Sequence, residues 1–289
     1  MSIPRMRDIL EPHVEEISKR VYMDNHLAII RGTADMLRLI ILQQPPFTFD
    51  DMRMGIILRG EATTNLNLIE KHFTAGMLIY IGPGSIINPV SISPDFEFYG
   101  VGILADFPFQ TKMPQAMNGQ VRDFQIVAGE ADLVTARHIL DTLWHVVHLP
   151  DYNMETASSL IAAQMYHYDV LYRKHTDNIL GLQSREQTLF DRFLQLVNQH
   201  APREHHIDFY ASRMCLTERY LGTVIRKASG VTAKEWIDRA LIAHIKVELR
   251  HTDKSLTQIS EELSFPNPSF FSKYFKRLTQ MTPAEYRKS

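Results

Sequence analysis

The sequence predicts an α+β protein with a β-rich N-terminal part and an all-α C-terminal part, and three observations support this. Short β-branched and aromatic runs separated by Gly and Pro fill residues 34–104. From residue 132 the apolar residues adopt the i, i+3/i+4 spacing of helices. One segment of the last third occurs twice, which indicates two copies of a helical unit. The chain has 289 residues, and at about 150 residues per domain it fits two domains.

Composition and charge limit the possible function classes. Hydrophobic residues make up 45% of the chain, which is typical of globular proteins. Residues 1–184 hold 14 Lys and Arg against 21 Asp and Glu, whereas residues 185–289 hold 17 against 12, so the net charge changes from −7 to +5. We therefore expect only the C-terminal part to meet a polyanion.

The cysteine count and the absence of long apolar runs bear on where in the cell the protein is expected. A single cysteine, Cys215, excludes an intrachain disulfide and a cysteine metal cluster, and we expect it to be a small buried residue. The N-terminus lacks the apolar segment of a signal peptide, and no run of 18 apolar residues occurs. The sequence therefore predicts a cytoplasmic protein that makes no membrane contact.

The N-terminal part is predicted to be a sandwich or small barrel, because it contains many short strands with regular turn signals. Residues 1–30 show no clear pattern. The predicted strands are ADMLRLIILQQ (34–44), MRMGIILRG (52–60), TTNLNLIEKHF (63–73), GMLIYIG (76–82) and FEFYGVGIL (96–104). Two amphipathic helices are predicted to follow, over residues 132–149 and 154–174, and the polar segment 175–187 is predicted to be an interdomain linker.

The repeat lies in the C-terminal third. Residues 220–236 match residues 270–286 at an offset of 50, and the match continues upstream at an offset of 49. Duplicated helix–turn–helix units would tolerate this one-residue difference in the turn. The matched pairs include Tyr220 with Phe270, Leu221 with Phe271, Ile225 with Phe275, Thr232 with Thr282, Trp236 with Tyr286, and Met214 with Leu263.

Each repeated unit is predicted to hold a short helix (207–214 or 256–263), a tight turn and a second helix capped by Thr217 or Asn267. One face of the second helix is apolar and the other is polar and basic, which is the pattern of a helix that enters a DNA major groove. Residues 233–250 are predicted to form a connecting helix about 27 Å long. Two groove-reading helices would then lie roughly one DNA turn apart, about 34 Å.

Residues 256–287, LTQISEELSFPNPSFFSKYFKRLTQMTPAEYR, resemble the signature of the AraC/XylS family of transcription regulators, and the resemblance covers about residues 200–289. It implies that residues 185–289 are a DNA-binding domain of two helix–turn–helix units joined by a helix. Three positions depart from the family pattern: Ser260 replaces a small Ala, and Ser264 and Gln280 replace Gly. Where a turn needs a positive φ, losing Gly costs on the order of 1 kcal/mol.

The resemblance also implies which residues contact DNA. Matching the family position by position assigns base contacts to Arg219, Gly222, Thr223, Pro268, Ser269, Phe270 and Lys273. Arg219 is suited to a bidentate contact with guanine, and Phe270 to a thymine methyl group. Four further basic residues are better placed for phosphates: Arg226, Lys227, Lys276 and Arg277.

The order of the parts resembles family members with a cupin-like sensory domain, here residues 1–130. Residues 76–90, GMLIYIGPGSIINPV, look like a cupin strand–turn–strand segment. Because residues 34–104 have no His-x-His pair, we expect no metal, no cofactor and no catalytic residue. Candidate effector-binding residues are Arg38, Tyr80, Asn88 and Tyr99, and the alternative for each is ordinary core or surface packing.

The resemblance implies a regulator that binds double-stranded DNA, responds to a small-molecule effector and activates transcription through RNA polymerase. In similar regulators the helical segment, here residues 131–184, pairs two subunits, so a homodimer is expected. Packing within one subunit remains the alternative for the proposed seam of Leu160, Ile161, Met165, Tyr168 and Leu171. Two other functions stay open: a regulator controlled by a protein partner rather than a ligand, and a cupin-fold enzyme.

Overall fold

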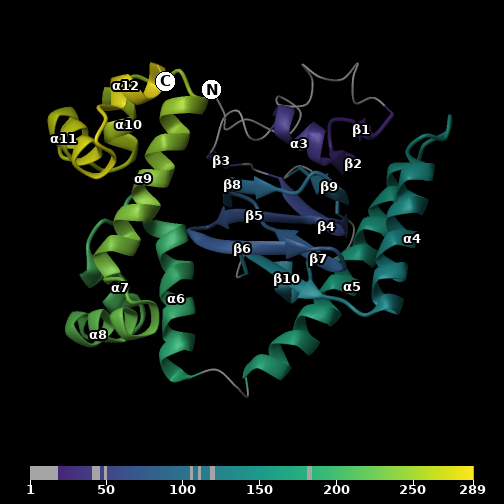
Figure 1. Ribbon diagram of the computed structural model, residues 1–289, viewed down its shortest axis with the longest axis horizontal. Coiled ribbons are helices and arrows are strands. Elements are labelled where there is room, and N and C mark those ends of the chain that lie inside the picture. The colour runs from purple at the N-terminus through teal and green to yellow at the C-terminus, as the bar shows by residue number, and fades with distance from the viewer. Residues whose placement is uncertain are drawn as a thin grey trace. The chain divides into compact units, whose positions relative to one another are not determined.

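The computed structural model describes residues 19–40, 46–48, 51–104, 107–109, 112–117, 121–180 and 184–288 (Figure 1). The chain divides between Leu180 and Gly181 into two compact units, called here the N-terminal and C-terminal units. The sequence placed the start of the C-terminal domain at residue 185. Among the described residues, no helix is long and apolar enough to cross a membrane.

Two antiparallel sheets form the N-terminal unit. The six-stranded sheet has the order β1-β2-β9-β4-β7-β10, and the four-stranded sheet has the order β3-β8-β5-β6. The larger sheet contains β1 (Val21–Met23), β2 (Leu27–Thr33), β4 (Met52–Arg59), β7 (Met77–Ile81), β9 (Glu97–Ile103) and β10 (Asp123–Val127). The smaller sheet contains β3 (Phe47–Thr48), β5 (Glu61–Leu66), β6 (Ile69–Thr74) and β8 (Ile86–Ile92).

An apolar cluster lies between the two sheets. Ile57 and Ile79 reach it from the larger sheet, and Leu66 and Phe73 reach it from the smaller one. The predicted run of residues 63–73 is a hairpin rather than one strand, because Asn67 and Leu68 turn the chain with positive φ angles of 50° and 75°. The β-rich layered fold predicted for this part is thus present, as two facing sheets.

The first predicted strand is wrong, because Ala34–Ile40 form helix α3 and residues 41–44 lie outside the described part. ADMLRLI is rich in strong helix formers, and a short apolar run has no periodicity that separates helix from strand. Asp35 and Arg38 pair across one turn at 3.5 Å. The chain also enters the sheet earlier than expected, since β1 and the start of β2 lie within the first 30 residues, in which the sequence shows no clear pattern.

Two helices cover the outer face of the larger sheet: α4 (Glu130–Val146) and α5 (Met154–Leu180) (Figure 1). Helix α5 extends six residues beyond the predicted end at Lys174, and α6 begins at Arg185, so nine of the 13 residues of the predicted linker 175–187 are helical. Between the helices and the sheet lies the largest apolar cluster of the unit, where Leu140 and Leu143 of α4 meet Met54 and Val101 of the sheet.

This packing overturns the predicted subunit seam. Ile161, Met165, Tyr168 and Leu171 are buried in their own unit, and the Tyr168 hydroxyl donates to the Gly55 carbonyl at 2.9 Å. Leu160 is half-buried against the same cluster. These side chains form the core between the helices and the sheet, which was the alternative, so they are not a surface open to a second subunit.

The C-terminal unit is entirely helical in its described residues. Figure 1 shows one helix–turn–helix pair near each end of the central helix α9, α7 with α8 and α10 with α11. The helices are α6 (Arg185–His200), α7 (Ile207–Arg213), α8 (Glu218–Ser229), α9 (Ala233–His251), α10 (Leu256–Glu262), α11 (Pro268–Thr279) and α12 (Pro283–Lys288). The predicted helices of the repeat and the connecting helix are confirmed within one or two residues.

Candidate DNA-binding interface

The turns of the two units have the same hydrogen bonds at an offset of 49. In the first unit the Met214, Cys215 and Leu216 amides donate to the carbonyls of Tyr210, Ser212 and Ala211 at 2.9–3.1 Å. In the second, Leu263, Ser264 and Phe265 donate to Ile259, Glu261 and Ser260 at 2.9–3.0 Å. The extra residue is Pro266, between this turn and the next cap. The repeat seen in the sequence is therefore a repeat of backbone geometry.

Beyond the turn the correspondence continues at an offset of 50. Thr217 caps α8 by accepting from the Tyr220 amide, and Asn267 caps α11 by accepting from the Phe270 amide. After each helix a threonine and a glutamate cap each other: the Thr232 amide donates to Glu235 at 2.9 Å, and the Thr282 amide donates to Glu285 at 2.7 Å. These reciprocal caps fix where α9 and α12 begin.

Helices α8 and α11 each bury one face. Leu221, Val224 and Ile225 hold α8, and α6 packs against it with Phe190, Phe193, Leu194 and Val197. Phe271, Tyr274 and Phe275 hold α11 against α10 and the second half of α9. Each unit therefore rests on a long helix, α6 or α9, and the sequence analysis did not recognise this role of α6. Its apolar spacing at positions 190, 193/194 and 197 was the available signal.

The opposite faces of α8 and α11 are open to solvent. Of the seven residues predicted to contact bases, all are exposed except Gly222, which is half-buried. On α8 they lie in the first half of the helix, and the Thr223 hydroxyl donates back to the Arg219 carbonyl at 2.9 Å. On α11 they are Pro268, Ser269, Phe270 and Lys273. The structure thus gathers each set on one exposed helix face, and base contact itself stays a prediction.

The four residues predicted to contact phosphates are exposed at the C-terminal ends of the same helices. Two of them have partners. The Lys227 ammonium bonds to Glu186 at 2.7 Å, which raises the pKa of Lys227 and lowers that of Glu186. Arg277 stacks on the Tyr274 ring at 5.4 Å. Arg226 and Lys276 are thus the stronger phosphate candidates, since Lys227 would have to exchange Glu186 for DNA.

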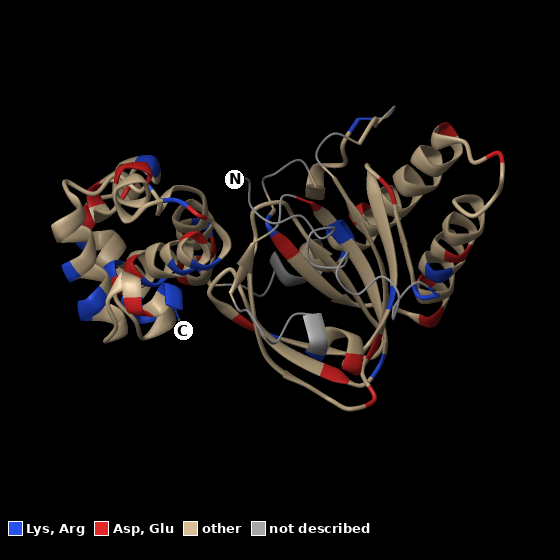
Figure 2. Ribbon diagram, turned by 90° about the horizontal axis from the view of Figure 1, so that it is seen from above, with Lys and Arg blue, Asp and Glu red and all other residues tan. Residues whose placement is uncertain are grey.

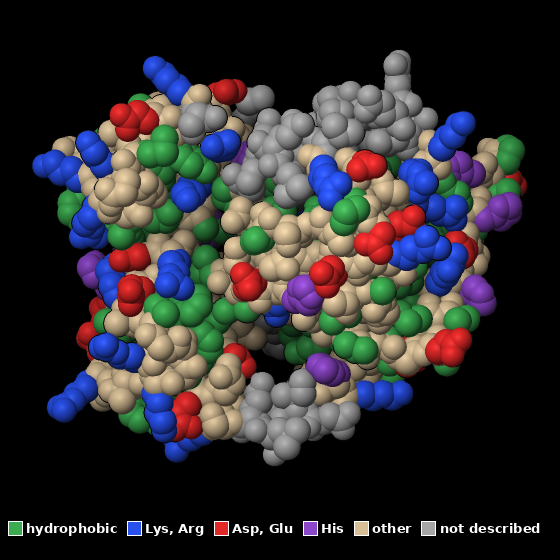
Figure 3. Space-filling view, in the orientation of Figure 1, with side chains coloured by type: hydrophobic (Ala, Val, Ile, Leu, Met, Phe, Trp, Pro, Cys, Tyr) green, Lys and Arg blue, Asp and Glu red, His purple; other side chains and the backbone are tan. Residues whose placement is uncertain are grey.

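Charge is distributed as the sequence predicted. Lys and Arg positions are spread along the helices of the C-terminal unit, with Asp and Glu positions among them (Figure 2), and many of these side chains lie on the face shown in Figure 3. Because an exposed ion pair contributes little free energy, the Lys227–Glu186 pair is not a strong barrier to a phosphate contact. The helical unit therefore presents exposed cations on the two helices, α8 and α11, whose opposite faces are packed.

The structure adds one candidate that the sequence analysis missed. Tyr220 lies beside Arg219 in the first turn of α8 and is 42% exposed, and its repeat partner Phe270 is 53% exposed. Large exposed aromatic side chains at matching positions of both helices are suited to contacts with bases. Tyr220 could have been found from the sequence through its pairing with Phe270 in the repeat, because a role predicted for Phe270 is also expected at the matching position.

A network around Asp238 joins the second unit to the connecting helix. The Tyr274 hydroxyl donates to Asp238 at 2.7 Å, and the Lys234 ammonium does so at 2.6 Å. Burial, followed by the hydrogen bond and charge of Asp238, raises the pKa of Tyr274, so the hydroxyl stays a donor at neutral pH. Helix α11 is thus tied to α9 by a charge-assisted hydrogen bond as well as by packing.

Positive φ angles occur at the positions where Gly is missing. Ser264 has φ 56° and Gln280 has φ 64°, and the first unit has Cys215 at 57° and Gly230 at 72°. Cys215, expected to be buried, is exposed and forms this turn instead. Its side chain points to solvent because the left-handed turn, rather than core packing, sets its orientation.

We expect Gln280→Gly to raise the free energy of unfolding by about 0.5–1 kcal/mol, since Gly adopts this φ without the steric cost of a Cβ. Urea unfolding of the full chain followed by circular dichroism measures the change. Gly230→Ala is the matched variant at the repeat position in the first unit, and it should lower stability by a similar amount. Equal stability of the Gln280 variant and the parent would contradict the strain argument.

Ser260 departs from the family pattern at a costly place. Its side chain is fully buried, and its hydroxyl has no hydrogen-bond partner among the described residues. Because a buried hydroxyl without a partner is unfavourable, Ser260→Ala should stabilise the chain by about 1 kcal/mol. Thermal unfolding provides the measurement. The mirror substitution Ala211→Ser, at the repeat position, should destabilise, and a loss of stability in Ser260→Ala would show that the hydroxyl is satisfied.

The residues predicted to bind an effector lie apart from one another. Arg38 is on α3, and its guanidinium donates to the Ile92 carbonyl at 3.0 Å. Asn88 is half-buried on β8. Tyr80 and Tyr99 are buried between the larger sheet and its helices, where burial raises the pKa of each to about 12. None of the four lines the cavity between the sheets, so the structure does not bring them together as one site.

Comparisons with known proteins agree with this geometry. The helix-turn-helix domain family matches residues 210–289. The HTH-type transcriptional activator RhaR of Shigella dysenteriae serotype 1 is 24% identical over 249 residues, covering 83% of this chain and 86% of RhaR. RhaR of Salmonella schwarzengrund is 26% identical over 159 residues, covering 55% and 56%. A structure of ToxT from Vibrio cholerae has a TM-score of 0.39 at 15% identity, covering 91% of this chain and 97% of that one.

The duplicated geometry and the family match define a helix–turn–helix DNA-binding regulator. Its C-terminal domain is of the AraC/XylS type, as the resemblance implied.

Proposed function

We propose that this chain is a transcription activator that reads two successive major-groove segments, one with α8 and one with α11. The observation that carries the proposal is the exact repetition of turn and cap hydrogen bonds, which presents two equivalent exposed helix faces. The connecting helix α9 has 19 residues and is about 28 Å long. That length suits two helices separated by roughly one turn of B-DNA.

The finer parts of the proposal come from the relatives. RhaR is a transcriptional activator by name, and we propose that this chain activates too, in the cytoplasm, through contact with RNA polymerase and under control of a small-molecule effector bound by the N-terminal unit. The proposal assigns no catalytic activity to the chain. An effector changes DNA binding only if it binds the DNA-competent and the DNA-incompetent states of the protein with different affinities.

We also propose a homodimer, whose contact surface differs from the predicted seam. Tyr166 and Val170 are exposed apolar residues on the outward face of α5, at 44% and 41% exposure. They replace the buried Ile161 and Met165 as candidate contacts. Sedimentation equilibrium of the full chain measures the state, and a monomer at tens of micromolar would remove the homodimer from the proposal.

Binding-site selection from random duplex DNA, at near-physiological salt, tests the central proposal. The full chain should enrich two short motifs about ten base pairs apart, because each helix reads one groove segment. A control chain with Phe270→Asp and Lys273→Asp on α11 should enrich only the motif of α8. The proposal is contradicted if the parent chain enriches neither motif, both alone and in the presence of small molecules from a cell extract.

A further inference from the structure

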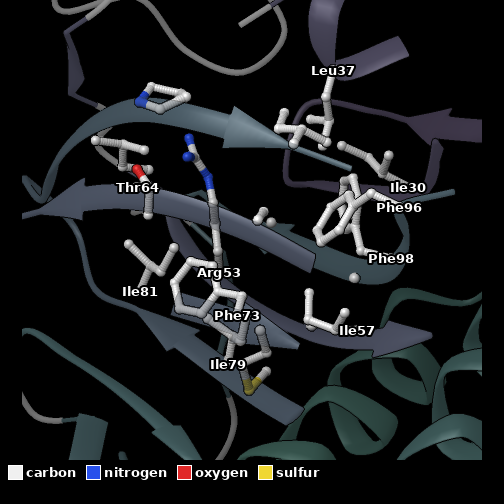
Figure 4. A pocket seen from close by; sticks show the side chains of 18 of the residues that line it. Ile30, Leu37, Arg53, Ile57, Thr64, Phe73, Ile79, Ile81, Phe96 and Phe98 are labelled. Atoms are coloured by element: carbon white, nitrogen blue, oxygen red, sulfur yellow. The ribbon is translucent and has the colours of Figure 1, made fainter. Parts of the chain in front are cut away.

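A cavity of about 220 Å³ lies between the two sheets of the N-terminal unit. Cavities of about 150 Å³ are known to hold benzene, so this one has room for roughly ten non-hydrogen atoms. Its wall is almost entirely apolar (Figure 4). The labelled apolar side chains come from both sheets and from α3, and they include Ile57, Phe73, Ile79, Ile81, Phe96 and Phe98.

Among the described residues of the cavity wall, Arg53 is the cationic side chain, and it is already paired. Arg53 donates to both carboxylate oxygens of Asp51, from Nε at 3.0 Å and from Nη2 at 2.8 Å. Asp51 is buried and Arg53 is mostly buried, so the pair brings no net charge to the cavity. Because Asp51 already neutralises Arg53, a ligand carboxylate in the cavity would gain little from this cation, and it would lose its own hydration.

One hydroxyl in the wall lacks a partner. The Thr64 Oγ1 atom is buried, and it has no hydrogen-bond partner among the described residues. Thr64 alternates with Thr63 along β5, so it shares the inward face with Ala62 and Leu66 of the core between the sheets. A buried hydroxyl without a partner is unfavourable, and a ligand oxygen at this place would satisfy it.

We propose that this cavity binds a neutral, mainly apolar molecule of roughly ten non-hydrogen atoms that carries one hydroxyl or carbonyl oxygen, which is hydrogen bonded to Thr64. The class excludes sugars, because most of their hydroxyls would have no hydrogen-bond partner in an apolar wall. It also excludes carboxylates, because the arginine in the wall is already neutralised by Asp51. The regulatory role of this ligand rests on the proposed function, but the binding itself does not.

Calorimetry with the full chain and three matched probes tests the class at pH 7.5. 1-Naphthol supplies a neutral hydroxyl, 1-naphthoate a carboxylate, and 1-methylnaphthalene no hydrogen-bonding group; decanol and decanoate repeat the comparison on a flexible chain. We expect 1-naphthol to bind at least tenfold more tightly than 1-naphthoate. The proposal would be overturned if 1-naphthol and decanol both bind with dissociation constants above about 1 mM. It would also be overturned if the carboxylates bind as tightly as the matching alcohols, or more tightly.

Two variants test the place of binding. Thr64→Val keeps the shape of the side chain and should weaken 1-naphthol about fivefold to tenfold while leaving 1-methylnaphthalene unchanged. Without ligand it should melt at the same temperature or higher, because it removes an unsatisfied hydroxyl. The control is Thr63→Val on the same strand. Thr63 also borders the cavity, but its hydroxyl lies 3.1 Å from His72 Nδ1 on the other face, so this variant should leave the affinity for 1-naphthol unchanged. Equal effects of the two variants would overturn the assignment to Thr64.

DNA binding is measured separately, so the two failures are distinguishable. Ligand binding without any DNA selection would overturn the proposed function and leave the cavity assignment standing. DNA selection without binding of any neutral probe would overturn the cavity assignment alone. If both hold, 1-naphthol should shift the affinity for the selected DNA in the parent, and Thr64→Val should reduce that shift.

Discussion

Replacing Phe275 by Ala should lower the free energy of unfolding of the C-terminal unit by about 3–5 kcal/mol. Phe275 is fully buried in α11, and its ring meets that of Tyr286 edge-on at 5.6 Å. The truncation leaves a cavity between α11, α10 and α9, so it loses both the transfer free energy of the ring and its packing contacts. The second helix–turn–helix unit depends on this contact most directly.

Trp236 reports on unfolding of the C-terminal unit as a whole, since the chain has two tryptophans and the other, Trp144, lies in the N-terminal unit. Urea unfolding followed by Trp236 fluorescence in a Trp144→Phe background gives the change. Phe270→Ala is the matched control: it removes the same side chain from the same helix, but from a position 53% exposed, so it should cost less than about 0.5 kcal/mol. If both variants lose a similar amount of unfolding free energy, α11 does not have one packed face and one free face.

Arg219→Ala should relax sequence preference at one position of the first DNA motif, at a cost of about 1–3 kcal/mol for the preferred base. Arg219 is exposed in the first turn of α8, and its side chain has no ion pair among the described residues that would hold it away from DNA. A bidentate contact to guanine explains this size, because one base pair supplies both acceptors.

Fluorescence anisotropy with single-base variants of the selected site, at several salt concentrations, measures this effect. Lys276→Ala is the comparison variant, because Lys276 is exposed and is predicted to contact a phosphate. Loss of that contact should weaken binding to all DNA sequences alike and reduce the salt dependence of binding by about one ion. An unchanged base preference in Arg219→Ala, or a uniform loss like that of Lys276→Ala, would remove Arg219 from base reading.

Much of the helical unit was predictable, because its stability is organised locally. The caps at Thr217 and Asn267, and the i, i+4 pairs Leu221/Ile225 and Phe271/Phe275, are short-range signals repeated twice. A duplicated pattern gives every expectation a second test within one chain. The positive φ at Ser264 and Gln280 followed from the family resemblance instead, since a turn position that usually holds Gly keeps its backbone angle when the residue changes.

The N-terminal unit was less predictable at the level of single residues. Arg38 was assigned to a strand, and it lies on helix α3. Tyr80 and Tyr99 were ligand candidates, and they pack against helices α4 and α5 on the far side of the larger sheet. Met165 was a subunit contact, and it is part of that same packing. In each case the residue type was read correctly as apolar or polar, but the partner surface was not known.

The sequence by itself determined the class of fold, the duplicated unit, the helix boundaries within that unit and the basic character of the C-terminal part, because propensity, caps, spacing and charge act over a few residues. Only the tertiary structure decided that α5 buries its apolar face within one unit, that Lys227 is held by Glu186, and that Asp51 neutralises Arg53 beside a cavity with Thr64 in its wall. These facts depend on which strands and helices meet across the fold, and such long-range pairings leave no local pattern in the chain.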